Sequence, residues 1–400
     1  MPVGKDALLN DNGQGPTLAW STATAAAVLA ALYWYMTGNG LHTTSDSIYY
    51  ISAANSWRET GQLLDPDGSP YRYWGPLYPL LLSVRLSTGA TRVLHGAALV
   101  SNLLLWSWIG GKLLPQRRAL VLPWALALST ALMVPAAFVW SETVFAVLLA
   151  GYCGALIAWG KSGKSGWLAL ATGAAFLLPL QRTAGMVLLA GVGLGLVICR
   201  SKPRQWGLLL VHWVLSAAGG VAWNYYAERV AGTRPDHGFG TLAKLWGSLA
   251  DYGFVLLRWF LPLPAVGRTL WAGMIAVALP VGLTVLWVGT ARNTRSTPEN
   301  RPALRLLWLM AVVYVLGLLL AVNMTRGATG LYDAERYVAV LSGPVLLLAL
   351  AAWPLVERRG LRWVQRGIVA AWLLYLAVRV GHNVLALRLP VSKDVFSKER

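Results

Sequence analysis

The chain has 400 residues, of which 56% are hydrophobic and only 12% are charged. An ordinary soluble domain has roughly 25% charged residues, and many apolar runs here reach the ~20 residues that a bilayer-crossing helix needs. This composition excludes a soluble globular protein and predicts an all-α, polytopic membrane protein. The net charge of +18 is compatible with nucleic acid, anionic lipid or membrane topology as its cause. Its distribution along the chain decides between them.

Eleven apolar segments predict about eleven transmembrane helices in a single domain that covers residues 1–386. The polar residues before the first segment lack the basic region of a cleaved secretory signal, so we expect the first segment to remain as a membrane helix. The segments are 17–37, 91–111, 119–138, 142–159, 166–181, 184–199, 206–226, 269–290, 305–322, 337–356 and 363–386.

Lysine and arginine gather in alternate connections between these segments. Five short connections hold sixteen of the 34 Lys and Arg residues, and short loops rich in Lys and Arg face the cytoplasm. We therefore expect a multi-pass protein of the cell (inner or plasma) membrane, with a cytoplasmic N-terminus and a short outer tail at 387–400. Topology then explains most of the positive charge, and nucleic acid is not an expected partner. The five connections are 112–118, 160–165, 200–205, 291–305 and 357–366.

Most acids fall in the opposite set of connections, with only Glu299 and Glu357 in the basic ones. The opposite set includes a first outer loop at 41–90 and a longer one at 227–268. Within the longer loop, residues 241–264 are amphipathic and too charged for a typical span, so we expect an interfacial or re-entrant helix there. Polar chemistry is therefore expected on the outer face of the membrane.

The first outer loop is expected to carry two amphipathic helices on the membrane surface. Ser45 can cap a helix that begins at Asp46, and Gly61 is a natural end for that helix. A second helix is expected to start at Pro76 and to end at Gly89. Both are too short or too polar to span the bilayer, so the loop is interpreted as a platform.

Asp46 opens the first of these helices. A carboxylate at a helix N-terminus is favourable by roughly 0.3–1 kcal/mol without any further role. The same position suits a general base or a metal ligand, because both must be ionised at neutral pH. Asp65 and Asp67 lie in the sequence LLDPDGSP and are expected to form a turn.

Charged residues recur at three other outer corners. Glu142, in VPAAFVWSETVF, is expected at the outer end of a span, where a charge is expensive unless it faces a cavity or a partner. Arg182, in FLLPLQRTAG, has a similar place, and a snorkelling side chain is its non-functional interpretation. The sequence LYDAERYVAV brings Glu335, Arg336 and Tyr337 to the start of a late span. Arginine suits phosphate because its planar fork donates two hydrogen bonds at once.

Taken together, these motifs resemble the membrane module of the GT-C glycosyltransferases, in particular the protein O-mannosyltransferases and the lipid A aminoarabinose transferases. The matching pieces are Asp46 after the first span, DSIYYISAANSW with the following aromatic-Pro-Leu-Tyr-Pro run, SETVF, LQRTAG and ERYVAV. They keep the family's order over most of the chain, although each motif is short. The resemblance implies transfer of a sugar from a polyprenyl-phosphate donor to a lipid, glycan or protein hydroxyl on the outer face, with inversion.

The resemblance also implies roles for single residues. Asp46 would activate the acceptor or organise the site, and Glu142 would correspond to a second outer acid. Arg182 and Arg336 would bind the lipid phosphate. No cofactor is certain, and the family leaves open a divalent metal, Mg or Mn, for which Asp46 and Glu142 would be the ligands. Further contacts to the substrate are expected from Tyr49, Tyr50, Trp74, Tyr78, Glu335 and Tyr337.

Two other classes compete with an enzyme. A transporter or flippase suits the predicted number of spans, but transporters place polar residues near the middle of the membrane. Here the span interiors are almost free of charge apart from ends such as Arg379, which favours chemistry at the surface. A non-catalytic GT-C relative is compatible with the same sequence. About fourteen residues follow the last predicted span, so a lipid or glycan acceptor is expected rather than a peptide.

Overall fold

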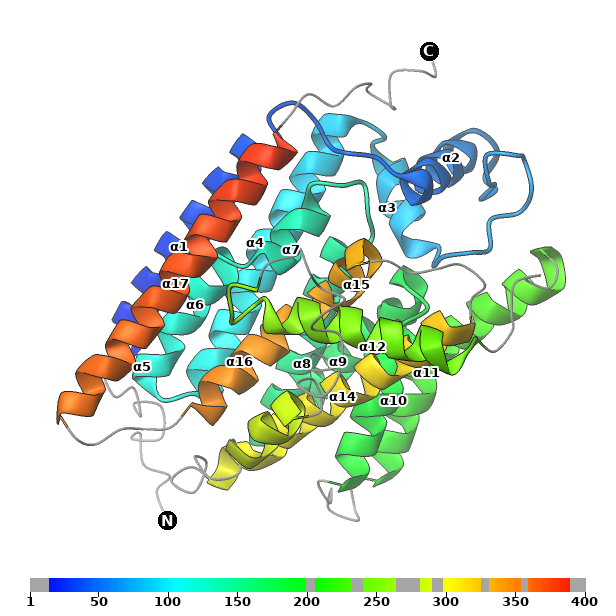
Figure 1. Cartoon of the computed structure of the whole chain (residues 1–400). Coiled ribbons are helices and arrows are strands. Elements are labelled where there is room, and N and C mark those ends of the chain that lie inside the picture. The colour runs from blue at the N-terminus through cyan, green and yellow to red at the C-terminus, as the bar shows by residue number, and fades with distance from the viewer. Residues whose placement is uncertain are drawn as a thin grey trace.

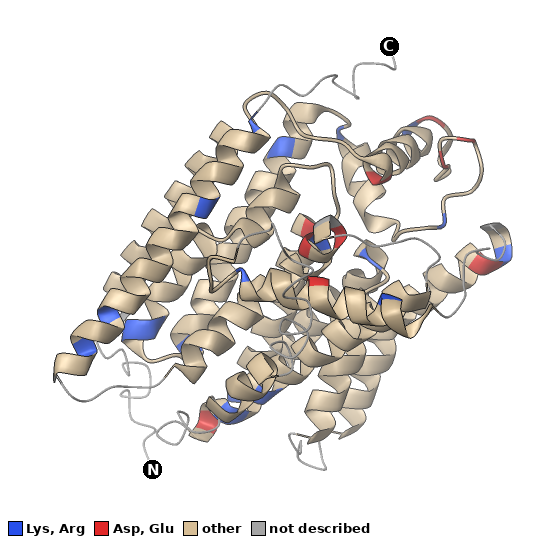
Figure 2. Cartoon of the chain, in the orientation of Figure 1, with Lys and Arg blue, Asp and Glu red and all other residues tan. Residues whose placement is uncertain are grey.

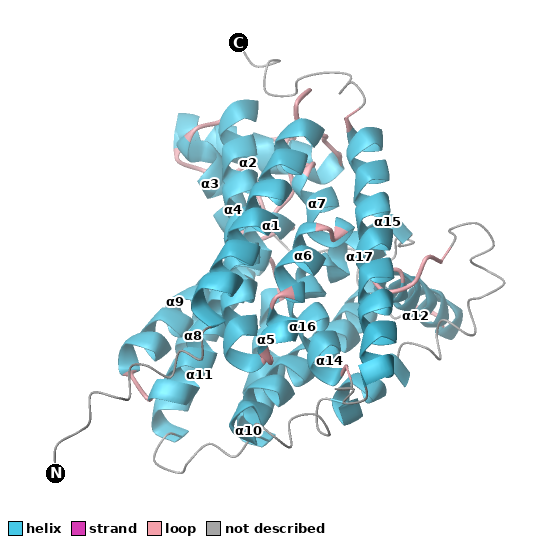
Figure 3. Cartoon of the chain, turned by 90° about the vertical axis from the view of Figure 1, so that its left-hand side faces the viewer, coloured by secondary structure: helices cyan, strands magenta, loops and turns pink. Residues whose placement is uncertain are grey.

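The computed structural model describes residues 14–198, 206–231, 240–263, 281–289, 298–324, 331–353 and 359–388. Within these ranges the regular elements are helices, joined by loops (Figure 3). Among the described residues, eight candidate spans are long and apolar enough to cross a membrane, against about eleven expected, and they confirm an all-α, polytopic membrane protein. Nearly all of the predicted tail at 387–400 and more than half of the predicted span at 269–290 lie outside the described residues.

The long helices run along one common direction, as α1 and α17 do in Figure 1. They are α1 (Gln14–Met36), α4 (Thr88–Leu113), α8 (Glu142–Ser162), α11 (Trp206–Ala231), α14 (Arg301–Met324) and α17 (Arg359–Leu387). The shorter ones are α2 (Ser45–Thr60), α3 (Leu77–Val84), α5 (Gln116–Ala119), α6 (Val121–Ala127), α7 (Thr130–Ala136), α9 (Ser165–Gln181), α10 (Gly185–Ile198), α12 (Leu242–Leu257), α15 (Leu331–Val338) and α16 (Ser342–Ala352).

The described parts of the basic connections lie at one end of the molecule. Lys161 Nζ donates to the carbonyl of Lys112 at 2.9 Å, and Arg118 Nη1 donates to the carbonyl of Ala351 at 3.0 Å. The first bond joins the connections 160–165 and 112–118, and the second joins 112–118 to the last turn of α16, which precedes the connection 357–366. Lys and Arg outnumber the acids at this end, which is the lower one in Figure 2.

The first outer loop and the end of α17 meet at the opposite end. Asn39 Nδ2 donates to the carbonyl of Arg388 at 2.7 Å, and a ring nitrogen of His42 bonds the carbonyl of Leu387 at 2.6 Å. Loop 41–90 therefore shares an end with the C-terminus of α17. The two sets of connections that the charge pattern separates thus lie at opposite ends of the fold.

The first outer loop begins with α2, whose N-cap is Thr44 rather than Ser45. The Thr44 side chain accepts from the backbone of Ser47, and the Ser47 hydroxyl accepts from the Thr44 N–H at 3.0 Å. This capping box moves the start of the helix one residue earlier than expected. The helix ends as predicted at Gly61, which has the left-handed φ of 72° and whose N–H donates to Trp57.

The second loop helix, α3, is shorter than the sequence predicted. It begins after Pro76 as expected, but it ends at Val84 because Arg85 is extended. Gly89 is not its end. Ser87 caps α4 by accepting from the Ala90 N–H at 3.2 Å, so Gly89 already lies in the first turn of that helix.

The loop packs as a unit with its own apolar cluster. Buried side chains from α2, the following turn and α3 meet Val139 and Val144 at the outer end of α8. The chain just before α8 is also tied to the loop, because the His42 N–H donates to Ala137 at 2.8 Å and the Val139 N–H donates to His42 at 3.0 Å. Loop 41–90 is therefore a platform fixed onto the helix bundle.

The segment predicted as one span at 119–138 is broken into α5, α6 and α7. The main break falls at Ser129, whose hydroxyl accepts from the Ala131 N–H at 3.3 Å and caps α7. A second interruption separates α15 from α16 by a 3-10 turn at Ala339–Leu341. Both breaks lie close to the charged residues described next.

Helix α12 crosses the bundle, and in Figure 1 it runs crosswise to α1 and α17. Thr241 caps it by accepting from the Lys244 N–H at 3.2 Å. Its last turn is held by α17, because the hydroxyl of Tyr375 donates to the carbonyl of Arg258 at 2.6 Å. This crosswise course matches the expectation of a helix that does not span, and it carries Arg258 toward α15.

Candidate functional site

Asp46 lies in the first turn of α2, where the Thr44 cap and the Ser47 hydroxyl fix the backbone. Ser47 donates onward to the carbonyl of Val139 at 3.0 Å, which ties this turn to the start of α8. The Asp46 Oδ2 atom lies 2.6 Å from Nη1 of Arg336, and the side chain is 19% exposed. Its Oδ1 atom accepts no hydrogen bond from the described residues. One oxygen of Asp46 is thus held by Arg336, and the side chain as a whole is partly exposed.

Glu142 begins α8 and is fully buried. One of its oxygens, Oε1, is contacted by Nη1 of Arg182 and by Nε of Arg336. The three side chains come from the start of α8, the corner between α9 and α10, and α15. A buried carboxylate requires such partners, because an unpaired charge there is strongly destabilising.

Arg336 is the residue that joins the two acids, since it contacts both Asp46 and Glu142. Its guanidinium carbon lies 4.4 Å from the centre of the Trp140 ring and 5.7 Å from that of Tyr337. Arginine stacks well on aromatic faces while its fork makes hydrogen bonds. The orientation of Arg336 is therefore fixed by two ion pairs and two rings.

Ser141 organises the back of the cluster. Its hydroxyl accepts from Nη1 of Arg182 at 3.2 Å and lies 3.2 Å from the hydroxyl of Tyr50. Its carbonyl accepts from Nε2 of Gln181 at 2.9 Å. The residue before the acid thus positions the arginine that pairs with the acid.

The described charges of this cluster balance. Arg182 and Arg336 carry two positive charges, and Asp46 and Glu142 carry two negative ones. The sequence predicted that both arginines bind phosphate. In the structure each is already paired, so the cluster itself has no excess positive charge with which to attract an anion.

A second charged group lies beside the first, and the sequence analysis missed two of its members. Oε1 of Glu335 accepts from Nη1 of Arg258 at 3.3 Å and from Nη2 of Arg379 at 3.2 Å. Arg379 is not at the end of its span, as the sequence suggested, because α17 continues to Leu387. An ionisable residue inside an apolar segment is the signal that identifies it. Nothing in the sequence around Arg258 identified it in the same way, because it lies in the amphipathic segment 241–264.

The aromatic residues of the platform pack around this region. Trp74 lies 5.1 Å from Tyr49 and 5.6 Å from Tyr50, measured between ring centres. Tyr78 is fully buried, and its hydroxyl bonds a ring nitrogen of His95 at 2.7 Å. The structure therefore brings Tyr49, Tyr50 and Trp74 together, while the hydroxyl of Tyr78 is engaged in the interior.

A divalent metal does not fit the two carboxylates that the sequence offered. A guanidinium stands between Asp46 and Glu142 and contacts both. In the part of the chain that the structure describes, no three His, Cys, Asp or Glu side chains come together as a cation site.

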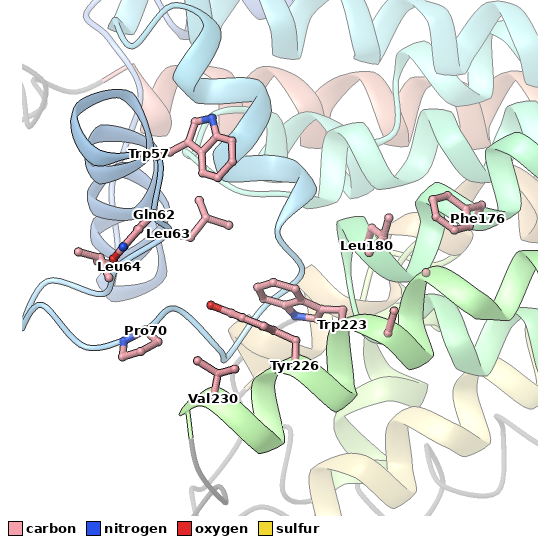
Figure 4. A pocket seen from close by; sticks show the side chains of 13 residues that line it. Trp57, Gln62, Leu63, Leu64, Pro70, Phe176, Leu180, Trp223, Tyr226 and Val230 are labelled. Atoms are coloured by element: carbon pink, nitrogen blue, oxygen red, sulfur yellow. The ribbon is translucent and has the colours of Figure 1, made fainter.

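An apolar pocket of about 690 Å³ opens between the platform and the C-terminal ends of α9 and α11. Figure 4 shows Trp57 and Leu63 of the platform facing Leu180 of α9 and Trp223 of α11 across it. The indole N–H of Trp223 donates to the carbonyl of Trp74 at 3.0 Å, which fixes one wall. Leu180 precedes Arg182 by two positions, so this pocket reaches the neighbourhood of the ion-paired cluster.

The turn at Asp65 and Asp67 is confirmed, because the Gly68 N–H donates to Asp65 at 2.9 Å and the Ser69 N–H donates to Oδ1 of Asp67 at 3.0 Å. Burial of the Asp65 carboxyl, followed by the nearby Asp67, raises the pKa of Asp65 to about 6. The bonds from Ser69 lower the pKa of Asp67. The two acids of one turn therefore titrate differently.

Comparison with solved structures shows a shared fold. The chain resembles the crystal structure of ArnT from Cupriavidus metallidurans bound to undecaprenyl phosphate, with a TM-score of 0.59 and 15% sequence identity over 93% of this chain and 76% of that one. The apo structure of the same protein gives a TM-score of 0.58 at 14% identity, with the same coverage. No family model and no curated protein matches. The chain thus shares the fold of ArnT, and the resemblance drawn from the sequence is confirmed at the level of the fold.

Proposed function

We propose that the protein is a glycosyltransferase that moves a sugar from a polyprenyl-phosphate donor to an acceptor hydroxyl at the outer face of the membrane. The observation that carries this proposal is Arg336, which joins a partly exposed carboxylate to a buried one at one end of a fold shared with ArnT. That fold is also known with undecaprenyl phosphate bound in ArnT. The residue roles below are part of the proposal.

Asp46 is the proposed general base. Its Oδ1 accepts the proton of the acceptor hydroxyl, while Arg336 holds Oδ2 and so fixes the direction of the carboxylate. The acceptor oxygen then forms a bond to the anomeric carbon as the bond from that carbon to the phosphate oxygen breaks. The carrier leaves as a polyprenyl phosphate, and attack from the opposite side inverts the anomeric centre.

Arg336 has a second role at the leaving group. Negative charge grows on the phosphate as the glycosidic bond breaks, and a fixed donor lowers the energy of that state. Nη2 of Arg336 is buried and has no partner among the described residues. Glu142, with Arg182 behind it, keeps Arg336 in place. The second acid is therefore proposed to position the arginine rather than to exchange a proton.

The apolar pocket of Figure 4 supports a lipid acceptor over a peptide. Its walls are mostly apolar and aromatic side chains, such as Leu180, Trp223 and Val230. Tyr49 and Trp74 are partly exposed members of the platform and are proposed to stack on the sugar, whereas the fully buried Tyr50 is proposed to support them from behind. The proposed orientation, with this end outside, follows from the charge of the connections.

The lipid-linked sugars of cells with and without the protein test this function. Loss of the enzyme should cause one polyprenyl-phosphate sugar to accumulate, and mass spectrometry of the lipid extract would identify it. The same extract should show that one glycolipid loses a sugar of the same mass. An unchanged set of polyprenyl-phosphate sugars would contradict the proposed function and would favour transport of another substrate.

A further inference from the structure

A groove at the basic end of the bundle lies between α17, the junction of α5 with α6, and the end of α16. It has a volume of about 460 Å³ and lies at the end opposite the platform, so it is separate from the site around Arg336. Figure 2 marks basic residues on α5 and at the start of α17. The charged residues that line the groove are Arg117, Arg118, Arg362 and Arg366.

Within the described residues, these arginines have no acidic partner. The lining of the groove contains no Asp or Glu, and none of the ion pairs between described residues includes an arginine of this groove. A guanidinium keeps its charge at any physiological pH. The groove therefore carries a fixed positive charge, and such charge in a confined site attracts anions.

Arg118 is the most buried of the four, with 8% of the residue exposed. Its Nη1 atom donates to the carbonyl of Ala351 at 3.0 Å, in the last turn of α16. Its Nη2 atom is buried and has no hydrogen-bond partner among the described residues. Buried donors are normally satisfied. This nitrogen of the groove wall therefore calls for an acceptor from outside the described chain.

Arg366 differs from the other three arginines because it already has a contact outside the groove. Its guanidinium carbon lies 4.9 Å from the centre of the Trp363 ring, and both residues are exposed. The aromatic face holds the guanidinium at the rim. The anion site is accordingly assigned to Arg117, Arg118 and Arg362.

Charged and apolar residues separate along the length of the groove. On α17, Arg362 comes first, and Leu373 follows eleven positions later, which is about 16 Å along a helix. On the facing wall, Arg118 comes before Val121. Both walls start from basic connections and run into the bundle, so the arginines lie at the mouth of the groove and the apolar residues lie deeper.

This order distinguishes a phospholipid from a soluble anion. A soluble phosphate would contact the arginines and leave the apolar walls uncovered, whereas a phospholipid places its phosphate at the mouth and its acyl chains along the walls. Chains can reach the groove from the bilayer, because the neighbouring face of α17 is apolar, with Val364 58% exposed and Ile368 49% exposed. Trp353 lies on the α16 wall, and tryptophan is enriched at the level of lipid headgroups.

We propose that this groove binds one anionic glycerophospholipid from the leaflet at the basic end. Its phosphate contacts Arg117, Arg118 and Arg362, and its acyl chains lie along α6, α16 and α17. Basic pockets between membrane helices bind anionic headgroups at the cytoplasmic side, which is the side that the charge of the connections assigns to this end. The inference does not depend on the proposed glycosyl transfer.

The bound lipid would also hold α17 against the bundle. Only 17% of the apolar stretch of α17 is buried inside the protein. A lipid that contacts α17 on one side and α6 and α16 on the other adds contacts at the basic end. Because a ligand of the folded state stabilises that state, the lipid should raise the unfolding temperature of the protein.

The test is titration of the purified full-length protein, in a neutral detergent, with phosphatidylglycerol, and native mass spectrometry measures the lipid bound. The wild type should bind one phosphatidylglycerol at least about fivefold more tightly than phosphatidylcholine with the same acyl chains. The double variant Arg117→Gln/Arg362→Gln should bind phosphatidylglycerol roughly 25-fold more weakly, since each basic residue near an anionic lipid contributes a factor of about five. Unchanged affinity in this variant would overturn the assignment of the groove.

Lys164→Gln is the matched control. Lys164 is exposed in the connection 160–165 at the same end of the molecule, and it does not line the groove. The variant removes the same kind of charge from the same side and should leave the affinity for phosphatidylglycerol unchanged. An equal loss of affinity in Lys164→Gln and in the double variant would indicate general attraction to the basic end and would overturn a defined site.

Arg118→Gln tests the buried donor. It should weaken phosphatidylglycerol binding by roughly fivefold or more although both arginines at the mouth remain, and unchanged affinity would overturn the role of Arg118. If this variant fails to fold, the double variant still decides the proposal, because Arg117 is exposed and Arg362 is half-buried. The unfolding temperature without added lipid shows whether each variant is folded.

Two comparison ligands identify the source of the anion. Glycerol phosphate has the charge without the acyl chains and should compete poorly with phosphatidylglycerol, whereas equal competition would assign the groove to a soluble anion. Phosphatidylcholine has the chains without the net charge, and equal affinity for it would overturn the role of the arginines. Phosphatidylglycerol should raise the unfolding temperature of the wild type more than that of the double variant, and equal shifts would contradict the attachment of α17 by the lipid.

Discussion

Nη1 of Arg336 lies 2.6 Å from Oδ2 of Asp46, which joins α15 to the first turn of α2. This ion pair brings a late helix to the first outer loop. The same guanidinium contacts Glu142 at the start of α8. The geometry of the proposed base is therefore set by three distant parts of the chain.

The Glu142→Gln variant should be strongly destabilised. It leaves Arg182 and Arg336 without their shared buried carboxylate, and breaking a buried ion pair typically costs about 3–5 kcal/mol. Thermal unfolding of the purified protein in detergent would measure the loss. Asp67→Asn, in the exposed turn, serves as the control, and equal unfolding midpoints of the two variants would contradict a supporting role for Glu142.

The Arg336→Lys variant should retain the positive charge but lose transfer. The three donors of a lysine lie on one nitrogen, so they cannot replace the three separate nitrogens with which Arg336 contacts Asp46 and Glu142 and faces the leaving phosphate. Loss of a donor aimed at developing charge reduces turnover by roughly 100-fold or more. The measurement is the rate of transfer from donor lipid extracted from cells that lack the protein. Arg366→Lys should transfer at the normal rate, and equal rates in both variants would show that charge alone is sufficient.

The stability of the platform should fall as the pH rises from 3.8 to about 6. Asp65 has a folded pKa of about 6 against an ordinary value of 3.8, because its carboxyl is buried. In this window the folded protein holds a proton that the unfolded chain has released, so the contribution of Asp65 is complete below pH 3.8 and is lost above about 6. Thermal unfolding across this range should show a negative slope, which Asp65→Asn should flatten. An identical slope in wild type and variant would contradict this account.

The orientation of the protein can be tested by labelling single cysteines. Ser69→Cys lies in the platform and Ser162→Cys at the opposite end, each in a background with Cys153 and Cys199 changed to alanine. A membrane-impermeant maleimide should label Ser69→Cys from outside intact cells, because the basic connections retain the other end in the cytoplasm. Labelling of Ser162→Cys without labelling of Ser69→Cys would invert the proposed orientation.

The sequence predicted much of the fold, because the hydropathy and the charge of whole segments determine where helices and connections lie. The lengths of the apolar segments predicted the helices. The basic connections lie at one end, where Lys161 and Arg118 donate hydrogen bonds to neighbouring segments. The chain order of Asp46, Glu142 and Arg336 identified side chains that the structure brings together. Short motifs were sufficient there because each lies next to a helix end.

Other features depend on packing that no local pattern records. The break at Ser129 lies within a continuous apolar run, so hydropathy predicted one uninterrupted helix. Arg258 joins the site only because α12 crosses the bundle and ends against α17. Pairing of Arg182 with Glu142 likewise required the tertiary fold. The sequence therefore identified the charged residues of the site but not which of them form ion pairs with one another.

The most direct test of the central claim is glycosyl transfer by Asp46→Asn, with donor lipid from cells that lack the protein and acceptor lipid from the same membranes. The variant keeps the shape of the side chain but cannot accept the acceptor proton. Transfer should fall to background while the protein elutes as the wild type does in gel filtration and Asp67→Asn retains normal activity. Normal transfer by Asp46→Asn would show that Asp46 is not the base and would contradict the account.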